Sequence, residues 1–216
     1  MAANGVSFQL SFAREITRVT AQIQTTAEQV KKAGDRARRK TMRWLSTRMS
    51  REMSQALKIP QKGLKARWST STAGQGDDQV TILWFGTLPL AAENVGNPRQ
   101  GKRGTSVAGR RFDGAFYHSV YDGVPRVWIR KRRAQALGLN LPAMSRQKGG
   151  GNQRFMDYGG AGDTSNRGRF PVMRVGIALD EMAGEVFRRY ERRALARFAE
   201  LIEQEINYVV NHERKG

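Results

Sequence analysis

Residues 177–210, IALDEMAGEVFRRYERRALARFAELIEQEINYVV, decide the fold of this chain. Large apolar side chains recur there every three or four positions along the whole stretch: Leu179, Met182, Val186, Phe187, Tyr190, Leu195, Phe198, Leu201, Ile202, Ile206 and Val209. This period predicts one long amphipathic helix. We expect its apolar stripe to be wide enough to cover a sheet and to reach a second helix, the one that contains Met42–Leu57.

Helices are also predicted in the N-terminal part of the chain. The spacing of apolar residues from Phe12 to Ala33 follows a helical period, and Gly34 followed by Asp35 is typical of a stop and a new N-cap. The next helix should run to about Leu57, where Ile59-Pro60 ends it. A short helical turn can follow at residues 60–65. Residues 5–10, GVSFQL, fit either a short edge strand or the lead into the first helix.

The middle of the chain favours strands. Residues 80–85, VTILWF, form a β-branched and aromatic run that predicts a buried strand. Residues 112–120 and 124–131 alternate in polarity around Asp122-Gly123, a strong hairpin signal, and residues 170–176 favour a fourth strand. The sequence therefore predicts an α+β fold, in which a small antiparallel sheet packs against N-terminal amphipathic helices and one long C-terminal helix.

Two segments show no period. Residues 86–111 and 138–169 are rich in glycine and arginine, and loops of this length usually reach a partner or stay flexible. We therefore predict a single domain over residues 1–216 with basic excursions at these two places. The second one should order only against neighbouring subunits, with Lys148, Arg154, Arg167 and Arg169 among its inter-subunit contacts.

The charge of the chain points to a polyanion. Its 216 residues include 38 Lys+Arg against 19 Asp+Glu, a net charge of +19. Most of the excess lies in residues 31–68 and 96–175, whereas residues 69–95 contain no basic residue. Because self-repulsion of this size opposes a compact monomer, counter-charge from DNA, RNA or an acidic protein ring is expected. No apolar run is long enough to span a bilayer, and the first residues do not follow the order of a signal peptide.

The sequence contains only weak matches to catalytic, phosphate-binding and metal-binding motifs. The absence of cysteine excludes a disulfide scaffold and a thiolate site, and His118 and His212 are the two histidines. Gly96-x-x-x-x-Gly101-Lys102 resembles a phosphate-binding loop, but Arg103 stands where Ser or Thr should hold magnesium. Scattered acids (Asp113, Asp122, Asp157 and Asp163) lack the spacing of a metal site, although a nuclease built from them stays open. We predict no enzyme, no cofactor and no metal.

The hairpin carries the candidate site. Its arms should end in a basic cluster that faces DNA or a partner: Arg110, Arg111, Arg130, Lys131, Arg132 and Arg133. The aromatic residues between them could stack on single-stranded nucleic acid, but their alternation favours a core role. No sequence-reading motif is present, so contacts would go to the phosphate backbone.

The layout of several segments resembles a known family. A basic helix ends in a Pro/Lys/Arg segment over residues 42–67, MRWLSTRMSREMSQALKIPQKGLKAR. A strand and a Gly/Arg-rich loop follow, then Gly114-Ala115-Phe116, Val127-Trp128-Ile129-Arg130, and Phe170-Pro171-Val172 before the long helix. Over most of residues 30–210 this order resembles the minor tail protein Z family of long-tailed bacteriophages.

That resemblance implies a structural role. Members are tail-completion proteins at the head-proximal end of the tail, so this chain would be a virion protein of the neck, assembled in the host cytoplasm. It would form a homo-oligomeric ring, most simply a hexamer, around the channel for genomic double-stranded DNA. Its neighbours would be tail-terminator or tail-tube proteins, the tape-measure protein and head stopper or connector proteins. The alternative from another class is a sequence-independent nucleic-acid-binding protein that acts as a monomer or dimer.

Overall fold

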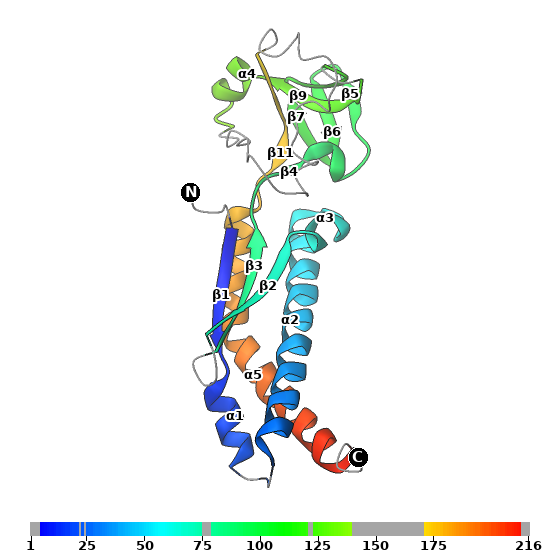
Figure 1. Cartoon of the computed structure of the whole chain (residues 1–216). Coiled ribbons are helices and arrows are strands. Elements are labelled where there is room, and N and C mark those ends of the chain that lie inside the picture. Colours follow the sequence, from blue (N-terminus) through cyan, green and yellow to red (C-terminus); the bar gives the residue numbers. More distant parts are fainter. Residues whose placement is uncertain are drawn as a thin grey trace. The chain divides into compact units, whose positions relative to one another are not determined.

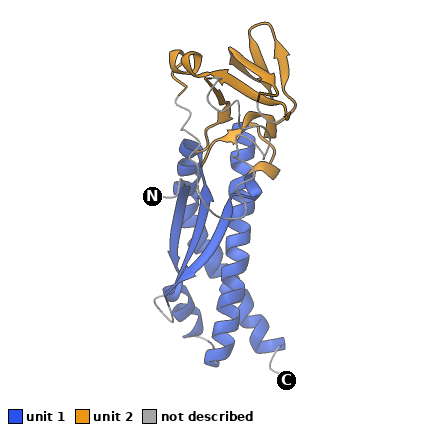
Figure 2. Ribbon diagram, turned by 45° about the horizontal axis from the view of Figure 1, so that its top comes forward, with its two compact units in different colours: residues 1–57, 64–87, 180–216 blue, residues 58–63, 88–179 orange. Residues whose placement is uncertain are grey.

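The computed structural model describes residues 5–21, 23, 25–74, 79–120, 123–139 and 171–212. The chain divides into two compact units (Figure 2). Unit 1 comprises residues 1–57, 64–87 and 180–216, and unit 2 comprises residues 58–63 and 88–179. The sequence predicts one domain, whereas the described residues between Leu88 and Leu179 build sheets of their own.

Unit 1 contains a three-stranded antiparallel sheet. The central strand β3 (Val80–Gly86) pairs with β1 (Gly5–Ser11) on one side and with β2 (Trp68–Ala73) on the other (Figure 1). The predicted buried strand is therefore confirmed, and residues 5–11 form the edge strand rather than the lead into a helix. Strand β2, WSTSTA, was not predicted because its small hydroxyl side chains lack an apolar face.

The N-terminal helices differ from the prediction. Helix α1 covers Ala13–Thr20, and α2 runs from Ala27 to Leu57 without a stop at Gly34-Asp35. The true start is a capping box, in which the Gln29 backbone N–H donates to Thr26 Oγ1 (3.3 Å) and the Thr26 N–H donates to Gln29 Oε1 (3.0 Å). Gly34 is buried within the helix, and Asp35 pairs with Arg38 one turn later instead of capping a helix.

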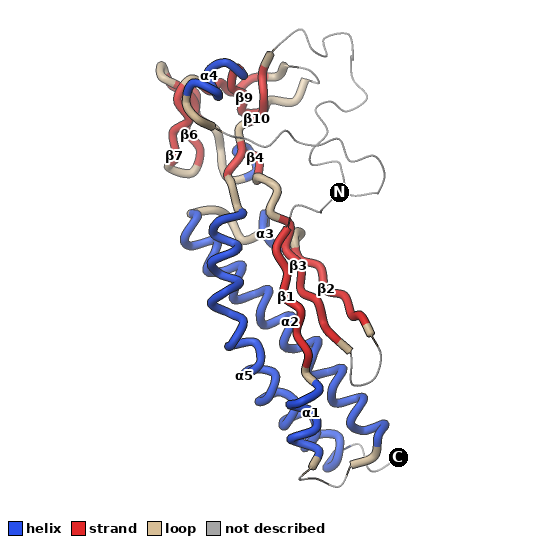
Figure 3. Tube along the Cα trace, turned by 90° about the vertical axis from the view of Figure 1, so that its left-hand side faces the viewer, coloured by secondary structure: helices blue, strands red, loops and turns tan. Residues whose placement is uncertain are grey.

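Helix α5 (Asp180–His212) forms the core of unit 1 with α2 and the sheet, as the sequence predicted. Both long helices lie on the same side of the sheet (Figure 3). The Phe187 ring packs on Phe8 of β1, with centroids 4.5 Å apart, and stacks on Trp68 of β2 at 5.7 Å. Phe198 stacks on Phe12 at 3.9 Å. Each of the buried phenylalanine side chains contributes about 1.5–3 kcal/mol of transfer free energy.

Unit 2 is built from short antiparallel strands. One sheet has the order β5 (Arg99–Gly101), β6 (Gly104–Val107), β7 (Arg110–Asp113), and a second has the order β10 (Val172–Arg174), β9 (Arg126–Arg130), β8 (Ala115–His118). The β8–β9 pairing confirms the predicted hairpin. Strand β4 (Leu90–Ala91) pairs with β11 (Gly176–Ile177).

Residues 86–111 were predicted to form a flexible excursion, but the structure shows that they contain regular secondary structure. Four strands and the 3-10 helix η2 (Ala92–Asn94) begin there, and they were missed because each is too short to show a period. Residues 140–169 of the second predicted excursion lie outside the described residues. The short helices α3 (Lys62–Lys65) and α4 (Lys131–Ala136) complete the described structure. The observed fold is α+β, as predicted.

The core of unit 2 surrounds Trp128, Val127 and Ile129 of β9, which are fully buried. A buried ion pair joins Arg174 of β10 to Glu93 of η2. Removing one partner of such a pair is costly, because the other charge then stays in a poorly solvated place. Among the described residues, we find no helix that combines the length and apolarity needed to cross a membrane.

Candidate nucleic-acid interface

The candidate site is built around the turn between β7 and β8 in unit 2. Gly114 occupies this turn with a φ of +77°, and its N–H donates to the Arg103 carbonyl oxygen at 2.8 Å. Arg103 belongs to the two-residue tip, Lys102-Arg103, of the β5–β6 hairpin. The hydrogen bond therefore places two cations that are distant in sequence beside Asp113-Gly114.

A close backbone approach at Gly104 makes this possible. A Cβ on Gly104 would lie 2.1 Å from the Phe112 carbonyl oxygen, a distance that no side chain can adopt. Glycine is thus required here, because β6 and β7 meet without room for a methyl group. The tip of the β5–β6 hairpin is held against the next turn as a result.

Arg133 of α4 reaches the same place. A Cβ on Gly114 would lie 2.9 Å from Arg133 Cγ and 3.1 Å from its Nε, so the arginine stem crosses the face of the glycine. The neighbours Arg130, Lys131 and Arg132 are exposed at the end of β9 and the start of α4. They continue the basic surface away from Gly114.

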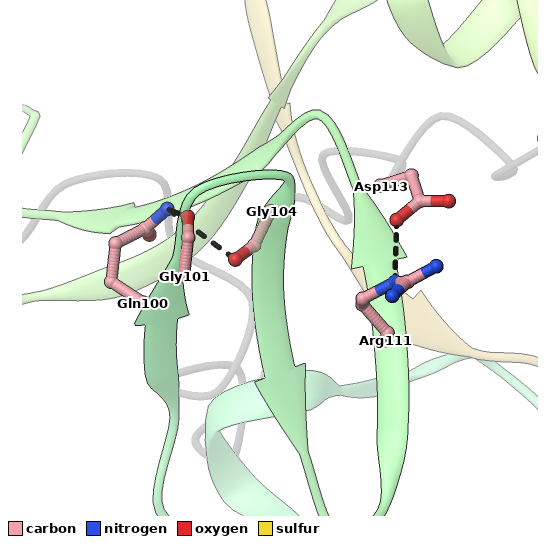
Figure 4. Close-up of polar contacts among 5 residues, drawn as sticks. All are labelled: Gln100, Gly101, Gly104, Arg111 and Asp113. Carbon is pink, nitrogen blue, oxygen red and sulfur yellow. Dashed lines mark hydrogen bonds and ion pairs between the residues drawn. The ribbon is translucent and has the colours of Figure 1, made fainter.

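Arg111 joins this group through Asp113. Its Nε donates to Asp113 Oδ1 at 2.7 Å, and both side chains are about half exposed (Figure 4). An exposed pair of this kind contributes less than about 1 kcal/mol to stability. Its main effect is to hold the Arg111 guanidinium beside Asp113. The Asp113 carboxylate, which is paired with Arg111, then does not neutralise the other cations.

Arg110 does not lie with the others. Successive residues of a strand point to opposite faces, so Arg110 and Arg111 face opposite sides of β7. Arg110 is also opposite Val107, at the far end of the strand from Asp113. The expectation that all six cations gather at one edge is therefore wrong for Arg110. The structure brings Arg111 and Arg133 to the same turn and leaves Arg130–Arg132 beside them.

Sequence reasoning missed three members of this surface. Arg99 lies opposite Ser106, which lies opposite Arg111, so the two arginines share one face of the sheet. Lys102 and Arg103 were considered only as part of a phosphate-binding loop, and they form a hairpin tip instead. The signal that could have found them is the pair of glycines, Gly101 and Gly104, on either side of a two-residue tip. We call Arg99, Lys102, Arg103, Arg111 and Arg130–Arg133 the unit 2 basic surface.

Gln100 fixes the hairpin to the neighbouring sheet. Its Nε2 donates to the carbonyl oxygens of Gly101 (3.0 Å) and Gly104 (3.5 Å), as Figure 4 shows. Its Oε1 accepts hydrogen bonds from the Thr105 hydroxyl and from the Tyr117 N–H of β8, both at 2.9 Å. The Gln100 side chain therefore links β5, β6 and β8, and it fixes the backbone from which the cations of the hairpin tip project.

The aromatic residues near the hairpin serve the core. Trp128 is fully buried and its Nε1 donates to the His118 carbonyl oxygen at 3.0 Å. Phe112, Phe116 and Tyr117 are half-buried, so these side chains do not form an open stacking platform. Tyr121 lies outside the described residues.

Of the residues considered for metal binding, the structure describes His118, His212 and Asp113. His118 is exposed, with its Nδ1 2.8 Å from the Ser119 carbonyl oxygen, and Asp113 is engaged by Arg111. The described parts of the chain hold no group of three or more His, Cys, Asp or Glu residues that could hold a metal ion. Asp122, Asp157 and Asp163 lie outside those parts, as do Lys148, Arg154, Arg167 and Arg169 of the predicted inter-subunit loop.

Ion pairs join α2 and α5 of unit 1 in both directions. Lys40 pairs with the buried Glu205, and Arg189 of α5 pairs with Glu52 of α2 at 2.6 Å. Burial raises the pKa of Tyr190, and the adjacent Glu52 carboxylate raises that pKa further. The positive charge of residues 31–68 is thus partly neutralised inside unit 1.

Comparison with protein-family models, with curated proteins and with solved structures finds no match to this chain.

Proposed function

We propose that this chain is a structural protein of a long-tailed bacteriophage virion, a tail-completion or neck component that forms a ring around the DNA channel and helps to join tail to head. The unit 2 basic surface carries this proposal. Its cations come from β5, the tip of the β5–β6 hairpin, β7, the end of β9 and the start of α4, and Asp113 is the acid placed among them. A wall that faces confined DNA needs dense positive charge and no base-reading groups.

The layout of the chain supports the same role. The order of basic helix, strand, glycine-rich segment, hairpin and long C-terminal helix is the order in which it resembles the minor tail protein Z family. A role without catalysis is part of the proposal. The competing candidate, a sequence-independent nucleic-acid-binding protein, draws on the same basic surface and differs in assembly and in virion location.

The direct test is genetic. An amber allele of the gene should give filled heads and separate tails by electron microscopy, because joining would fail. Genes for head, tail-tube or tape-measure proteins should lie next to it. Normal virions from the amber allele in a non-suppressing host would refute the tail-completion role and leave the nucleic-acid-binding alternative.

A second test addresses the basic surface. Replacing Arg130, Lys131, Arg132 and Arg133 with Gln should leave the fold intact, since exposed substitutions cost about 0.5 kcal/mol or less each. Tails should assemble but infectivity should fall. For purified protein on double-stranded DNA, the slope of log affinity against log salt should decrease by up to about 4, roughly one for each phosphate that is no longer neutralised.

The chain offers a charge-matched control. Arg39, Arg43, Arg48 and Arg51 are exposed on α2, and changing these four to Gln removes the same net charge from unit 1. This control should retain most of the salt slope and the infectivity. Equal losses for the two quadruple variants would mean that DNA affinity follows net charge alone and that the unit 2 basic surface has no special part.

A further inference from the structure

The sheet of unit 1 has two open edges. Strand β3 lies between β1 and β2, and among the described residues no strand pairs with the outer side of either (Figure 3). An open edge presents unpaired backbone N–H and C=O groups, which readily pair with another chain. Proteins that stay monomeric usually protect such edges with charge, proline or a bulge.

Neither edge carries that protection. The sequences of β1 and β2, GVSFQLS and WSTSTA, contain no charged residue and no proline, and both pair with β3 in continuous one-to-one register. In a chain of charge +19, these neutral edges are places where two copies can meet without like-charge repulsion.

Strand β2 is also poorly covered by its own unit. Trp68 packs on the core, but every residue from Ser69 to Ala73 is exposed, on both faces of the strand. On the face away from the helices, the Trp84 indole lies over the paired Gly5 and Gly86, where a Cβ on Gly5 would be 2.3 Å from Trp84 Nε1. Neutral strands beside a half-exposed aromatic ring match the composition of an interface core, which is depleted in charge and enriched in aromatics.

The hydrogen-bonding pattern of the sheet identifies which backbone groups are open. The Gly86 N–H donates to the Arg67 carbonyl oxygen at 3.0 Å, and in an antiparallel pair the bonded positions alternate. In the β2–β3 register, the backbone groups of Ser69 and Ser71 therefore point to β3, and those of Thr70 and Thr72 point outward. The same alternation along β3 directs the backbone groups of Ser7 and Gln9 outward from β1.

We propose that copies of this chain associate head to tail, with the β1 edge of one copy pairing with the β2 edge of the next. Both strands run antiparallel to β3, so they run parallel to each other. A rotation about an axis along the strands keeps their direction, and the two edges then meet as a parallel pair. Such a heterologous contact generates a closed ring when the rotation closes; the ring itself rests on the proposed function.

Proline variants test each edge separately. Thr70→Pro and Gln9→Pro each remove an outward N–H without breaking the ladder to β3, and proline is tolerated at such edge positions. Thr70→Ala and Gln9→Ala are the matched controls. In sedimentation velocity at raised salt, wild type and both alanine controls should form multimers. Each proline variant alone should be monomeric, with unchanged circular dichroism.

Mixing the two proline variants gives the decisive result. Each retains one intact edge, so a head-to-tail interface predicts a one-to-one heterodimer that grows no further. Dimers of a single proline variant would indicate an isologous contact and overturn the proposal. Multimers that are unaffected by both prolines, or a wild type that stays monomeric throughout, would overturn it as well.

Further variants separate loss of the interface from loss of folding. If Thr70→Pro fails to fold, Thr72→Lys, which keeps the N–H but adds a charge at the edge, should give the same loss of multimers. If the wild type assembles through another surface, the edge proposal fails while the amber-allele phenotype still tests the tail-joining role. Ser71→Pro, which removes a bond to β3, should be markedly less stable than Thr70→Pro.

Discussion

Truncation of Phe198 tests the packing on which unit 1 depends. Its side chain is fully buried, and its ring stacks on Phe12 with centroids 3.9 Å apart and planes inclined by 18°. A buried Phe→Ala change costs about 3–5 kcal/mol, because transfer free energy is lost and a cavity remains. The same change at Tyr208, half exposed on the same helix, should cost less than about 1 kcal/mol.

Urea unfolding followed by tryptophan fluorescence measures these differences. Trp44, Trp68 and Trp84 lie in unit 1 and Trp128 in unit 2, so a Trp128→Phe background reports on unit 1. Since whole domains are stable by about 5–15 kcal/mol, Phe198→Ala should shift the midpoint strongly, and Phe198→Asp should not fold. The pair Phe12→Leu and Phe198→Leu should show a coupling of about 0.5–1.5 kcal/mol in a double-mutant cycle. A Phe198→Ala loss no larger than that of Tyr208→Ala would refute the packing of this face.

Two further predictions concern backbone and pH. Gly104→Ala should destabilise unit 2 and weaken DNA binding, because its Cβ would meet the Phe112 carbonyl oxygen at 2.1 Å; Ala108→Gly, at a strained φ of +47° in the opposite turn, should instead stabilise by roughly 1 kcal/mol and leave binding unchanged, and equal stability of the two variants would contradict this. Because the folded pKa of Tyr190 is raised above the ordinary 10.0, the unfolded chain loses its proton first, so stability should be constant below about pH 10 and fall above it. Tyr190→Phe should reduce this alkaline loss in urea titrations at several pH values, and an unchanged pH profile would count against the shift.

Strong periodicity made the long elements predictable. The C-terminal helix buries large apolar residues at a regular helical spacing, which the sequence alone reveals. The end of α2 near Leu57 was predicted from Ile59-Pro60, and β3 was predicted from its continuous β-branched and aromatic run. The break between α1 and α2 was misplaced because a mid-helix Gly-Asp was given more weight than the capping box at Thr26. Glycine inside a helix costs only about 1 kcal/mol, and the contacts of the surrounding helix outweigh it.

Strands β4–β7 of unit 2 could not be predicted for a different reason. Strands of two to four residues show no period, and their stability comes from pairing between distant segments. The site has the same character. The Arg103 backbone reaches Gly114 through a hydrogen bond, and the Arg133 side chain reaches Gly114 through a close contact; no local sequence pattern encodes either contact. Arg110 shows the converse, since adjacency to Arg111 in sequence places it on the opposite face of a strand.

The two segments that carry most of the positive charge, residues 31–68 and 96–175, differ in how far acids neutralise them. In unit 1, ion pairs join the two long helices: Glu205 of α5 pairs with Lys40 of α2, and Glu52 of α2 pairs with Arg189 of α5. These ion pairs support the packing of the two helices, so part of the positive charge of residues 31–68 is already neutralised within the fold. In unit 2, Asp113 pairs with Arg111 and Glu93 pairs with Arg174. Arg130–Arg133, in contrast, are exposed and have no acid in their own segment of sequence. Surplus charge that is not neutralised within the fold keeps its attraction for a polyanion. It is for this reason that we propose a contact with DNA for unit 2 and a contact between copies for the neutral sheet of unit 1.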